Sequence, residues 1–191
     1  MLTALANIGT AFGLSSSAGL NAYIPLLLFA LAARLGWIEV GEPYDLIAHN
    51  YTLILLGILL IIEMLVDKVP ALDTANDLIQ TFIRPLAGAF LFAVNANVIT
   101  DASPILAIMA GIVLAGGVHA AKGVTRPVVT ATTAGTGNWA VSLVEDIISF
   151  FTSLMALILP LLLMVVLLPL MAFGGLKLFR RWRNRNKLAF D

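Results

Sequence analysis

The longest apolar stretch of the chain runs from Trp139 to Leu178, about 40 residues, and it constrains the fold more than any other feature. At about 1.5 Å per residue, a helix of this length exceeds the roughly 30 Å hydrocarbon core of a bilayer. Shorter apolar runs precede it, and only 12% of the residues are charged, against roughly a quarter in soluble domains. We therefore expect an integral membrane protein and not a soluble globular domain.

Polar breaks between the apolar runs predict an all-α fold with about five transmembrane helices, some of them broken or kinked. These helices form one membrane domain, residues 1–178, which is followed by a basic tail, residues 179–191. Leu2–Leu14 is too short to cross and is expected to lie at the interface or to re-enter partway. The predicted spans are 18–35, 51–66, 74–100, 103–121 and one crossing, kinked near Pro160 and Pro169, within 139–178.

Helix breaks and caps follow from turn-forming and charged residues. The charged segment 63–77 is expected to separate the second and third helices, and the segment 122–138, rich in Gly, Pro and Thr, is expected to be irregular. Ser15–Ser17 are predicted to cap the first span and Asp73 or Thr74 the third, which Arg84-Pro85 should kink. Segments 17–26 and 133–143 each place a small-residue turn and an Asn before an apolar helix. This echo suggests a weak inverted repeat of the kind found in transporters.

The basic residues are concentrated at the C-terminus, where six of the eleven lie in the last fifteen positions. The positive-inside rule therefore predicts a cytoplasmic tail, at the lipid headgroups of a bacterial cytoplasmic membrane. Five crossings counted back from the tail put the N-terminus outside and Arg34 inside. The polar clusters at 15–21, 63–77, 119–126 and 133–146 then share the outer half of the membrane. Nucleic-acid binding has no support, because the tail is the only basic run.

Helical spacing places the polar residues of the later helices on common faces. The third, fourth and fifth helices carry one stripe each: Asp77, Arg84, Gly88 and Asn95; His119, Lys122 and Arg126, if that helix continues so far; and Asn138, Ser142, Glu145, Ser149 and Thr152. Together with polar residues at the helix breaks they predict one intramembrane binding site. Its predicted residues are Asn21, Glu63, Asp67, Lys68, Asp73, Asp77, Arg84, His119, Lys122, Arg126, Asn138, Glu145 and Asp146.

A structural role is the competing interpretation for most of these residues. The aspartates and asparagines can cap helices, and the cations can pair with carboxylates or reach lipid headgroups. His119 by itself is more typical of a hydrogen-bonded helix contact than of a ligand. Glu145 and Asp146 suit a first helical turn, where the helix dipole favours acidic residues. Glu63 is the strongest functional candidate, because it lies among Leu and Ile residues, where a charge costs at least ~2.5–3.5 kcal/mol.

Ionisable residues within spans and broken helices are features that transporters use to bind ions. We therefore expect a small-ion or small-solute transporter or channel, without a required cofactor, in which Glu63 and Asp67 bind a cation or exchange a proton. Five small transmembrane helices are too few to enclose a wide pore by themselves. We therefore expect several copies of the chain to form a homo-oligomer.

Two alternatives compete with transport. Lys122, Arg126 and Pro127 resemble part of a lipid-phosphatase signature at shortened spacing, which would suit a membrane enzyme acting on a lipid headgroup or phosphate. Such an enzyme could use a divalent cation, for which Glu63 and Asp67 are the best ligands, with His119 beside them. In the other alternative, the protein is a non-catalytic assembly subunit whose charges only pair helices or protomers.

Three segments cover the most distinctive parts of the chain: GLSSSAGLNAYIPLL (13–27), EMLVDKVPALDTANDLIQTFIRPLAGA (63–89) and TAGTGNWAVSLVED (133–146). Together they resemble a bacterial integral-membrane family known as domain of unknown function 4126. The family pattern has Pro at the position of Trp139. The resemblance implies a compact membrane domain and assigns no activity.

Overall fold

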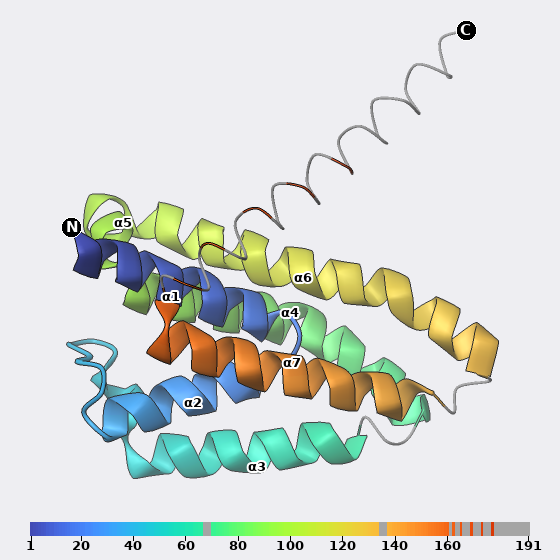
Figure 1. The fold of residues 1–191 in the computed structure, drawn as a ribbon. Coiled ribbons are helices and arrows are strands. Elements are labelled where there is room, and N and C mark those ends of the chain that lie inside the picture. The colour runs from blue at the N-terminus through green and yellow to red at the C-terminus, as the bar shows by residue number, and fades with distance from the viewer. Residues whose placement is uncertain are drawn as a thin grey trace, which may run out of the picture.

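The computed structural model is a bundle of helices (Figure 1). It describes residues 1–66, 70–133 and 137–160 and isolated positions up to 177, without the side chains of 70–75, 97, 98 and 127. Within that part no strand occurs, so the prediction of an all-α fold is confirmed. The elements are α1 (Leu2–Ala18), α2 (Tyr23–Arg34), the 3-10 turn η1 (Asp45–Ala48), α3 (Asn50–Val66), α4 (Pro70–Asn95), α5 (Asn97–Ala102), α6 (Pro104–Thr133) and α7 (Asn138–Ile158).

Three helices of the described chain are long and apolar enough to cross a membrane: residues Asn76–Asn95 of α4, all of α6 and all of α7. Two shorter helices, α2 and α3, are also apolar. Figure 1 shows α3, α4, α6 and α7 running along the length of the bundle. Of the residues in α3, only Leu56 and Glu63 are buried, and its other faces are mainly apolar and exposed, as lipid contact requires.

The first two helices form a hairpin that does not cross the bundle. α1 runs inward from the N-terminus, the chain turns at residues 19–22, and α2 runs back to the same end (Figure 1). With 12 residues, α2 spans only about 18 Å. The predicted crossing at 18–35 is therefore not confirmed, because the helix there covers only Tyr23–Arg34. Whether the first apolar segment re-enters the membrane or lies at its interface stays a prediction. The N-terminus and Arg34 lie at one end of the bundle, not on opposite sides.

Close packing explains why the hairpin turns where it does. Gly19 faces α6 so closely that an added Cβ would lie 2.5 Å from the carbonyl oxygen of Ala115 and 2.6 Å from Cβ of Val118. No other residue fits that position without moving a helix. Ser15–Ser17 lie inside α1 and not before a helix, so their predicted capping role is wrong. Asn21 provides the cap instead, since its Oδ1 accepts hydrogen bonds from the N–H groups of Tyr23 at 2.9 Å and Ile24 at 3.1 Å.

The boundary between α3 and α4 is shorter than predicted. α3 includes Glu63 and α4 begins at Pro70, a residue favoured in a first helical turn, so only residues 67–69 of the predicted break lie outside the two helices, and these are outside the description. Asp73 and Thr74 accordingly lie within α4 and do not precede it. The helix continues through Pro85 and ends at Asn95, before the predicted boundary at Thr100.

α6 is longer than predicted, because residues 122–133 are helical and only 134–136 lie outside the description. The threonines in this segment place their hydroxyls on the backbone of their own helix, which remains helical. Thr130, Thr132 and Thr133 donate from Oγ1 to backbone carbonyls three or four residues earlier, at 2.8–3.1 Å. The prediction of an irregular segment failed because a Thr-rich composition is equally compatible with such bonding.

α7 ends at Ile158, immediately before Leu159 and Pro160. The residue before a proline disfavours helical geometry, and Leu159 adopts φ −131°, ψ 57°. The long apolar stretch is thus not one uninterrupted helix from Trp139. Beyond Pro160 only isolated positions of the predicted crossing are described, and the basic tail, residues 179–191, lies outside the described residues.

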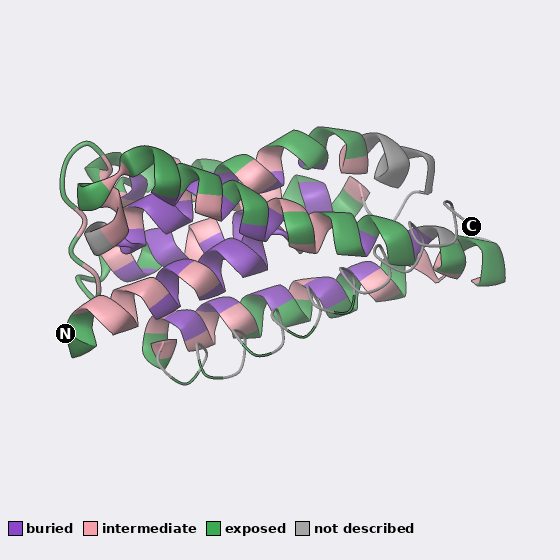
Figure 2. Cartoon of the chain, turned by 90° about the horizontal axis from the view of Figure 1, so that it is seen from above, coloured by how far each residue is buried: buried purple, intermediate pink, exposed green. Residues whose placement is uncertain are grey.

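α4 and α6 share the most extensive interface of the bundle. At its centre, a Cβ on Gly88 would lie 2.8 Å from the carbonyl oxygen of Gly111, and a Cβ on Gly111 would lie 2.6 Å from Cα of Ala89. The two backbones therefore touch, as small residues allow in membrane helices. Figure 2 shows the buried residues on the inner faces of the helices, with the exposed residues facing outward.

Candidate functional site

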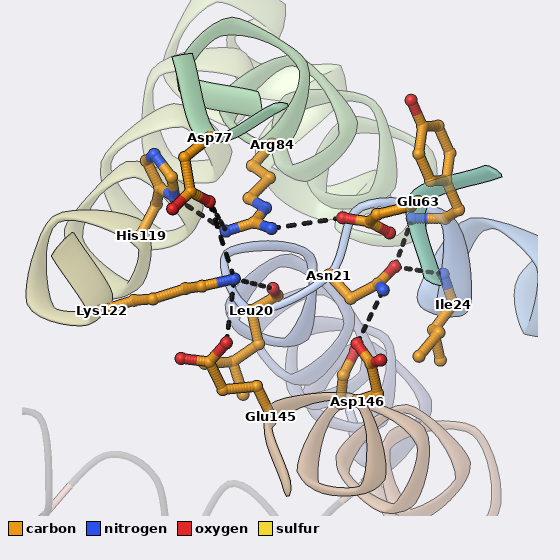
Figure 3. Close-up of polar contacts among 12 residues, drawn as sticks. Leu20, Asn21, Ile24, Glu63, Asp77, Arg84, His119, Lys122, Glu145 and Asp146 are labelled. Atoms are coloured by element: carbon orange, nitrogen blue, oxygen red, sulfur yellow. Dashed lines mark hydrogen bonds and ion pairs between the residues drawn. The ribbon is translucent and has the colours of Figure 1, made fainter. Parts of the chain in front are cut away.

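Arg84, near the middle of α4, is the largest fully buried side chain in the described structure, with 1% of its surface exposed. Its guanidinium binds Glu63 of α3, with 3.2 Å between Nη2 and Oε1 (Figure 3). Glu63 is only 2% exposed, so both charges are removed from solvent. Glu63 therefore ties the otherwise apolar α3 to the interior of the bundle.

The other side of the Arg84 guanidinium contacts His119 of α6, with 3.0 Å between Nη1 and Nδ1. A guanidinium can only donate, so Nδ1 accepts and the ring proton of His119 lies on Nε2. That Nε2 donates to Oγ1 of Thr81 over 3.1 Å, and Thr81 in turn donates to the backbone carbonyl of Asp77 at 2.8 Å. His119 is thus a hydrogen-bonded contact between helices, as its structural interpretation predicted.

Lys122 and Arg126, on the same face of α6, join α4 to α7. Lys122 Nζ lies 2.9 Å from Oε2 of Glu145 and 4.0 Å from Oδ1 of Asp77. Arg126 contacts the same two carboxylates, at 3.3 Å from Glu145 and 3.1 Å from Asp77. The predicted face formed by His119, Lys122 and Arg126 is confirmed, because α6 remains helical through all three.

The tip of the hairpin reaches this cluster from the opposite end of the bundle. The backbone carbonyl of Leu20 lies 3.5 Å from Nζ of Lys122 (Figure 3). Next to it, Asn21 donates from Nδ2 to Oδ1 of Asp146 over 2.9 Å. Asn21 is 1% exposed, and it both caps α2 and holds α7. We refer to Glu63, Asp77, Arg84, Lys122, Arg126 and Glu145 as the charged network.

The charges of the network balance, with three cations and three carboxylates. Five of its six residues are less than 9% exposed, and Asp77, whose side chain is 30% exposed, is the one that reaches the surface. Such pairs roughly offset the cost of removing their charges from water. Removing one partner leaves a buried charge uncompensated and costs about 3–5 kcal/mol. The network therefore fixes the arrangement of the helices more than it adds stability.

Hydroxyl groups along the contact between α1 and α7 were largely missed by sequence reasoning. Ser17 Oγ lies 2.8 Å from Oγ of Ser149 and 2.7 Å from Oγ of Ser153, and all three residues are at most 1% exposed. Nearer the end of the bundle, Thr10 donates to the carbonyl of Ala156 at 2.9 Å. The predicted stripe on α7 included Ser149 but continued to Thr152, whereas the buried position is Ser153. Buried positions on one face of a helix recur every three or four residues, and this spacing from Ser149 would have indicated Ser153.

Some predicted residues lie apart from the network or outside the description. Asn138 begins α7, and its Oδ1 accepts from Thr130 at 3.0 Å on an exposed part of the surface. Asp67 and Lys68 lie outside the described residues, as does the side chain of Asp73. The segments around Asn21 and Asn138 both place an Asn at a helix start. The inverted repeat that they suggested stays a prediction.

Pairing within the charged network occupies the groups that could bind a metal ion or a phosphate. Among the described residues, no group of three or more His, Asp and Glu side chains is placed to hold a metal ion. Glu63, the favoured metal ligand, faces a guanidinium that competes with any cation for its oxygen. Lys122 and Arg126 are likewise shared with carboxylates, which weakens their capacity to bind a phosphate.

Comparison with known proteins identifies the family of the chain but no individual relative. Searches of curated proteins and of solved structures each found no match. A family model described as "Domain of unknown function (DUF4126)" matches residues 8–180. This range includes the hairpin from Ile8 onwards and every residue of the charged network. Because the match covers most of the sequence, the chain belongs to the DUF4126 family.

Proposed function

We propose that the protein is a transporter or channel for a small ion or solute, with the charged network as its operating element. The observation that carries the proposal is the concentration of six ionisable side chains from four helices around the tip of the hairpin. Ionisable residues inside membrane helices are costly and most often mark ion or proton pathways.

The hairpin supports the same function. Non-helical backbone at membrane depth is tolerated where protein or water surrounds it, and transporters use such breaks to place polar backbone groups at a binding site. Here the break at residues 19–22 presents the Leu20 carbonyl to Lys122 and the Asn21 amide to Asp146. A cation or proton that binds the Asp146 carboxylate competes with the Asn21 amide for its oxygen and can thereby shift the hairpin.

For its location we propose a bacterial cytoplasmic membrane with the basic tail in the cytoplasm. With a single crossing after Trp139, the end of the bundle that holds Arg34 and the N-terminus is then cytoplasmic. The chain contains no cysteine, so single cysteines at Asp45 and Thr132 can be labelled in cells with a membrane-impermeant maleimide. We expect only the cysteine at position 132 to be labelled in intact cells. Labelling of only the cysteine at position 45 would show that the protein has the opposite orientation.

The transport proposal is tested with purified protein in liposomes. We expect wild-type protein to release or take up at least one of H⁺, Na⁺, K⁺ and Cl⁻ faster than empty vesicles do. Glu63→Gln, which keeps the shape of the side chain and removes its charge, should abolish that flux. Asp101→Asn is the matched control, because Asp101 is exposed and distant in sequence from the network residues.

Two outcomes would contradict the proposal. If vesicles with wild-type protein leaked none of the tested ions faster than empty vesicles, the protein would have no role in transport. Unaltered flux in Glu63→Gln, with normal flux in the control, would remove the network from the mechanism. Loss of folding in both Glu63→Gln and a Lys122→Met variant, with no flux from the wild type, would favour the assembly subunit, whose charges only pair helices.

A further inference from the structure

A cavity of about 460 Å³ opens at the end of the bundle that holds the N-terminus, opposite the exposed side of the network. Its polar lining comes from α1, the loop after α2 and the end of α4: Thr3, Asn7, Thr10, Glu39 and Asn95. Glu39 is its one ionisable lining residue among those described, so the cavity favours cations over anions. Its floor includes Thr10, the first of the buried hydroxyls between α1 and α7.

From this floor, polar groups continue along α7 towards the network. Thr10 contacts the Ala156 carbonyl, and Ser153, Ser149 and Glu145 follow at steps of three or four residues, about 4.5–6 Å of helix rise each. Ser17 bridges Ser149 and Ser153. These groups form the hydroxyl seam, which we define as Thr10, Ser17, Ser149 and Ser153.

The seam is too tight for a hydrated metal ion. Its serine oxygens are in direct contact at 2.7–2.8 Å, and Ser149 and Ser153 have no exposed surface. Each hydroxyl carries one donor and two acceptor positions, and either oxygen of each serine pair can be the donor. Ser17 and Ser149 also donate to each other's backbone carbonyl, at 2.8 and 3.3 Å, so reversal requires these hydroxyls to rotate away from the carbonyls. Reversible chains of this kind pass protons without requiring space for water around a larger ion.

We propose that the cavity and the hydroxyl seam form a proton pathway from the N-terminal end of the bundle to Glu145, with Asp77 as the exit. This inference rests on the proposed transport function and names its ion. A hydronium in the cavity gives its proton to Thr10, the three serines pass protons among themselves, and the Glu145 carboxylate accepts the last. Within the described structure, hydrogen bonds between these side chains join only the three serines, so the steps from Thr10 to Ser153 and from Ser149 to Glu145 require rotation of the hydroxyls. Glu145 then returns to its charged form as the proton passes to the Asp77 carboxylate and from there to water.

The network is arranged for this transfer. Lys122 lies between the two carboxylates, at 2.9 Å from Glu145 and 4.0 Å from Asp77. When Glu145 is protonated, Lys122 and Arg126 lose part of their attraction to it and keep their attraction to Asp77. The shift draws the cations towards the partly exposed end of the network, which is where the proton leaves.

The test measures proton entry into liposomes that contain a pH-sensitive dye, driven by a potassium gradient with valinomycin. We expect flux in the wild type, and at least a tenfold slower flux in the double variant Ser149→Ala with Ser153→Ala. Thr132→Ala is the control, because it removes an exposed hydroxyl that bonds only to its own helix. Asp77→Asn should also slow proton flux, although Asp77 lies far from the seam in sequence.

The outcomes separate this inference from the proposed function. Flux of Na⁺, K⁺ or Cl⁻ without protons would overturn the pathway and leave the transporter in place. Proton flux that is unchanged in the serine double variant would overturn the seam alone. A wild type that moves no ion would remove both. Circular dichroism and gel filtration of each variant establish that a slower flux does not reflect unfolded protein.

Discussion

The interface between α4 and α6 is built in two different ways along its length. Around Gly88 and Gly111 the two backbones touch, and no side chain separates them. About one turn from Gly88, Arg84 meets His119 of α6, and about three turns from Gly88, Asp77 meets Arg126 of α6, both through polar or charged side chains. The first region fixes the helices by shape and the second by charge, so each should respond to a different kind of substitution.

The largest effect is expected in the charged region. Arg84→Gln leaves Glu63 buried at 2% exposure without its guanidinium, and should lower the free energy of unfolding by about 3–5 kcal/mol. Chemical denaturation in detergent micelles measures this loss. Arg34→Gln, at an exposed position, should change little.

A double variant sharpens the same point. Adding Glu63→Gln to Arg84→Gln removes the uncompensated charge, so much of the lost stability should return. If the double variant were less stable than Arg84→Gln alone, the interpretation of the pair as a charge balance would be wrong.

A smaller effect is expected where the backbones touch. Gly111→Ala places a methyl group 2.6 Å from Cα of Ala89, and should cost about 1–3 kcal/mol through separation of the helices. Gly117→Ala is the matched control on α6, since nothing lies within 4 Å of its added Cβ. A thermal unfolding midpoint that is equally affected by both substitutions would show that the close contact is not maintained in solution.

The hairpin tip should respond through its cap. Asn21→Ala removes the acceptor for two N–H groups at the start of α2, at a cost of about 0.5–2 kcal/mol. Asn21→Ser retains a capping oxygen and should recover much of this loss. Amide hydrogen exchange of Tyr23 and Ile24 locates the effect, and protection that survives in Asn21→Ala would exclude the cap.

Asp77→Asn is expected to have the smallest effect on stability among substitutions in the charged network. Its side chain is 30% exposed, so solvent screens its pairs in part, and Lys122 and Arg126 keep Glu145 as a partner; the loss should therefore be smaller than that for Arg84→Gln. Comparing the free energies of unfolding of Asp77→Asn and Glu63→Gln tests whether the ion pairs of the network contribute less stability towards its exposed side. A greater loss at Asp77 than at Glu63 would reverse that order.

The two regions also differ in how far the sequence predicts them. Charged residues in apolar runs are conspicuous, and helical spacing placed Arg84, Lys122 and Arg126 on the correct faces before any partner was known. Their pairing could not be derived, because it depends on which helices are neighbours. Gly88 stood on the predicted stripe, but its contact with Gly111 has no local signal.

The hairpin shows the same limit at the level of the fold. An apolar run of crossing length begins near Ala18, yet the path of the chain is decided by Gly19 against Ala115 and by Asn21 against Asp146. Both partners lie about a hundred residues away or more. Composition therefore predicted apolar helices long enough to cross a membrane, and tertiary contacts alone determined that the first two helices turn back.

The dependence of α1 on α7 bears on how the protein is made. Ser17 and Ser149 are separated by 132 residues, which takes the ribosome about 7–26 s at roughly 5–20 residues per second. During that interval the leading helix has left the ribosome and the helix that satisfies its hydroxyl has not been synthesised. The N-terminal segment is therefore among the first parts to reach the membrane and among the last to settle into its final position.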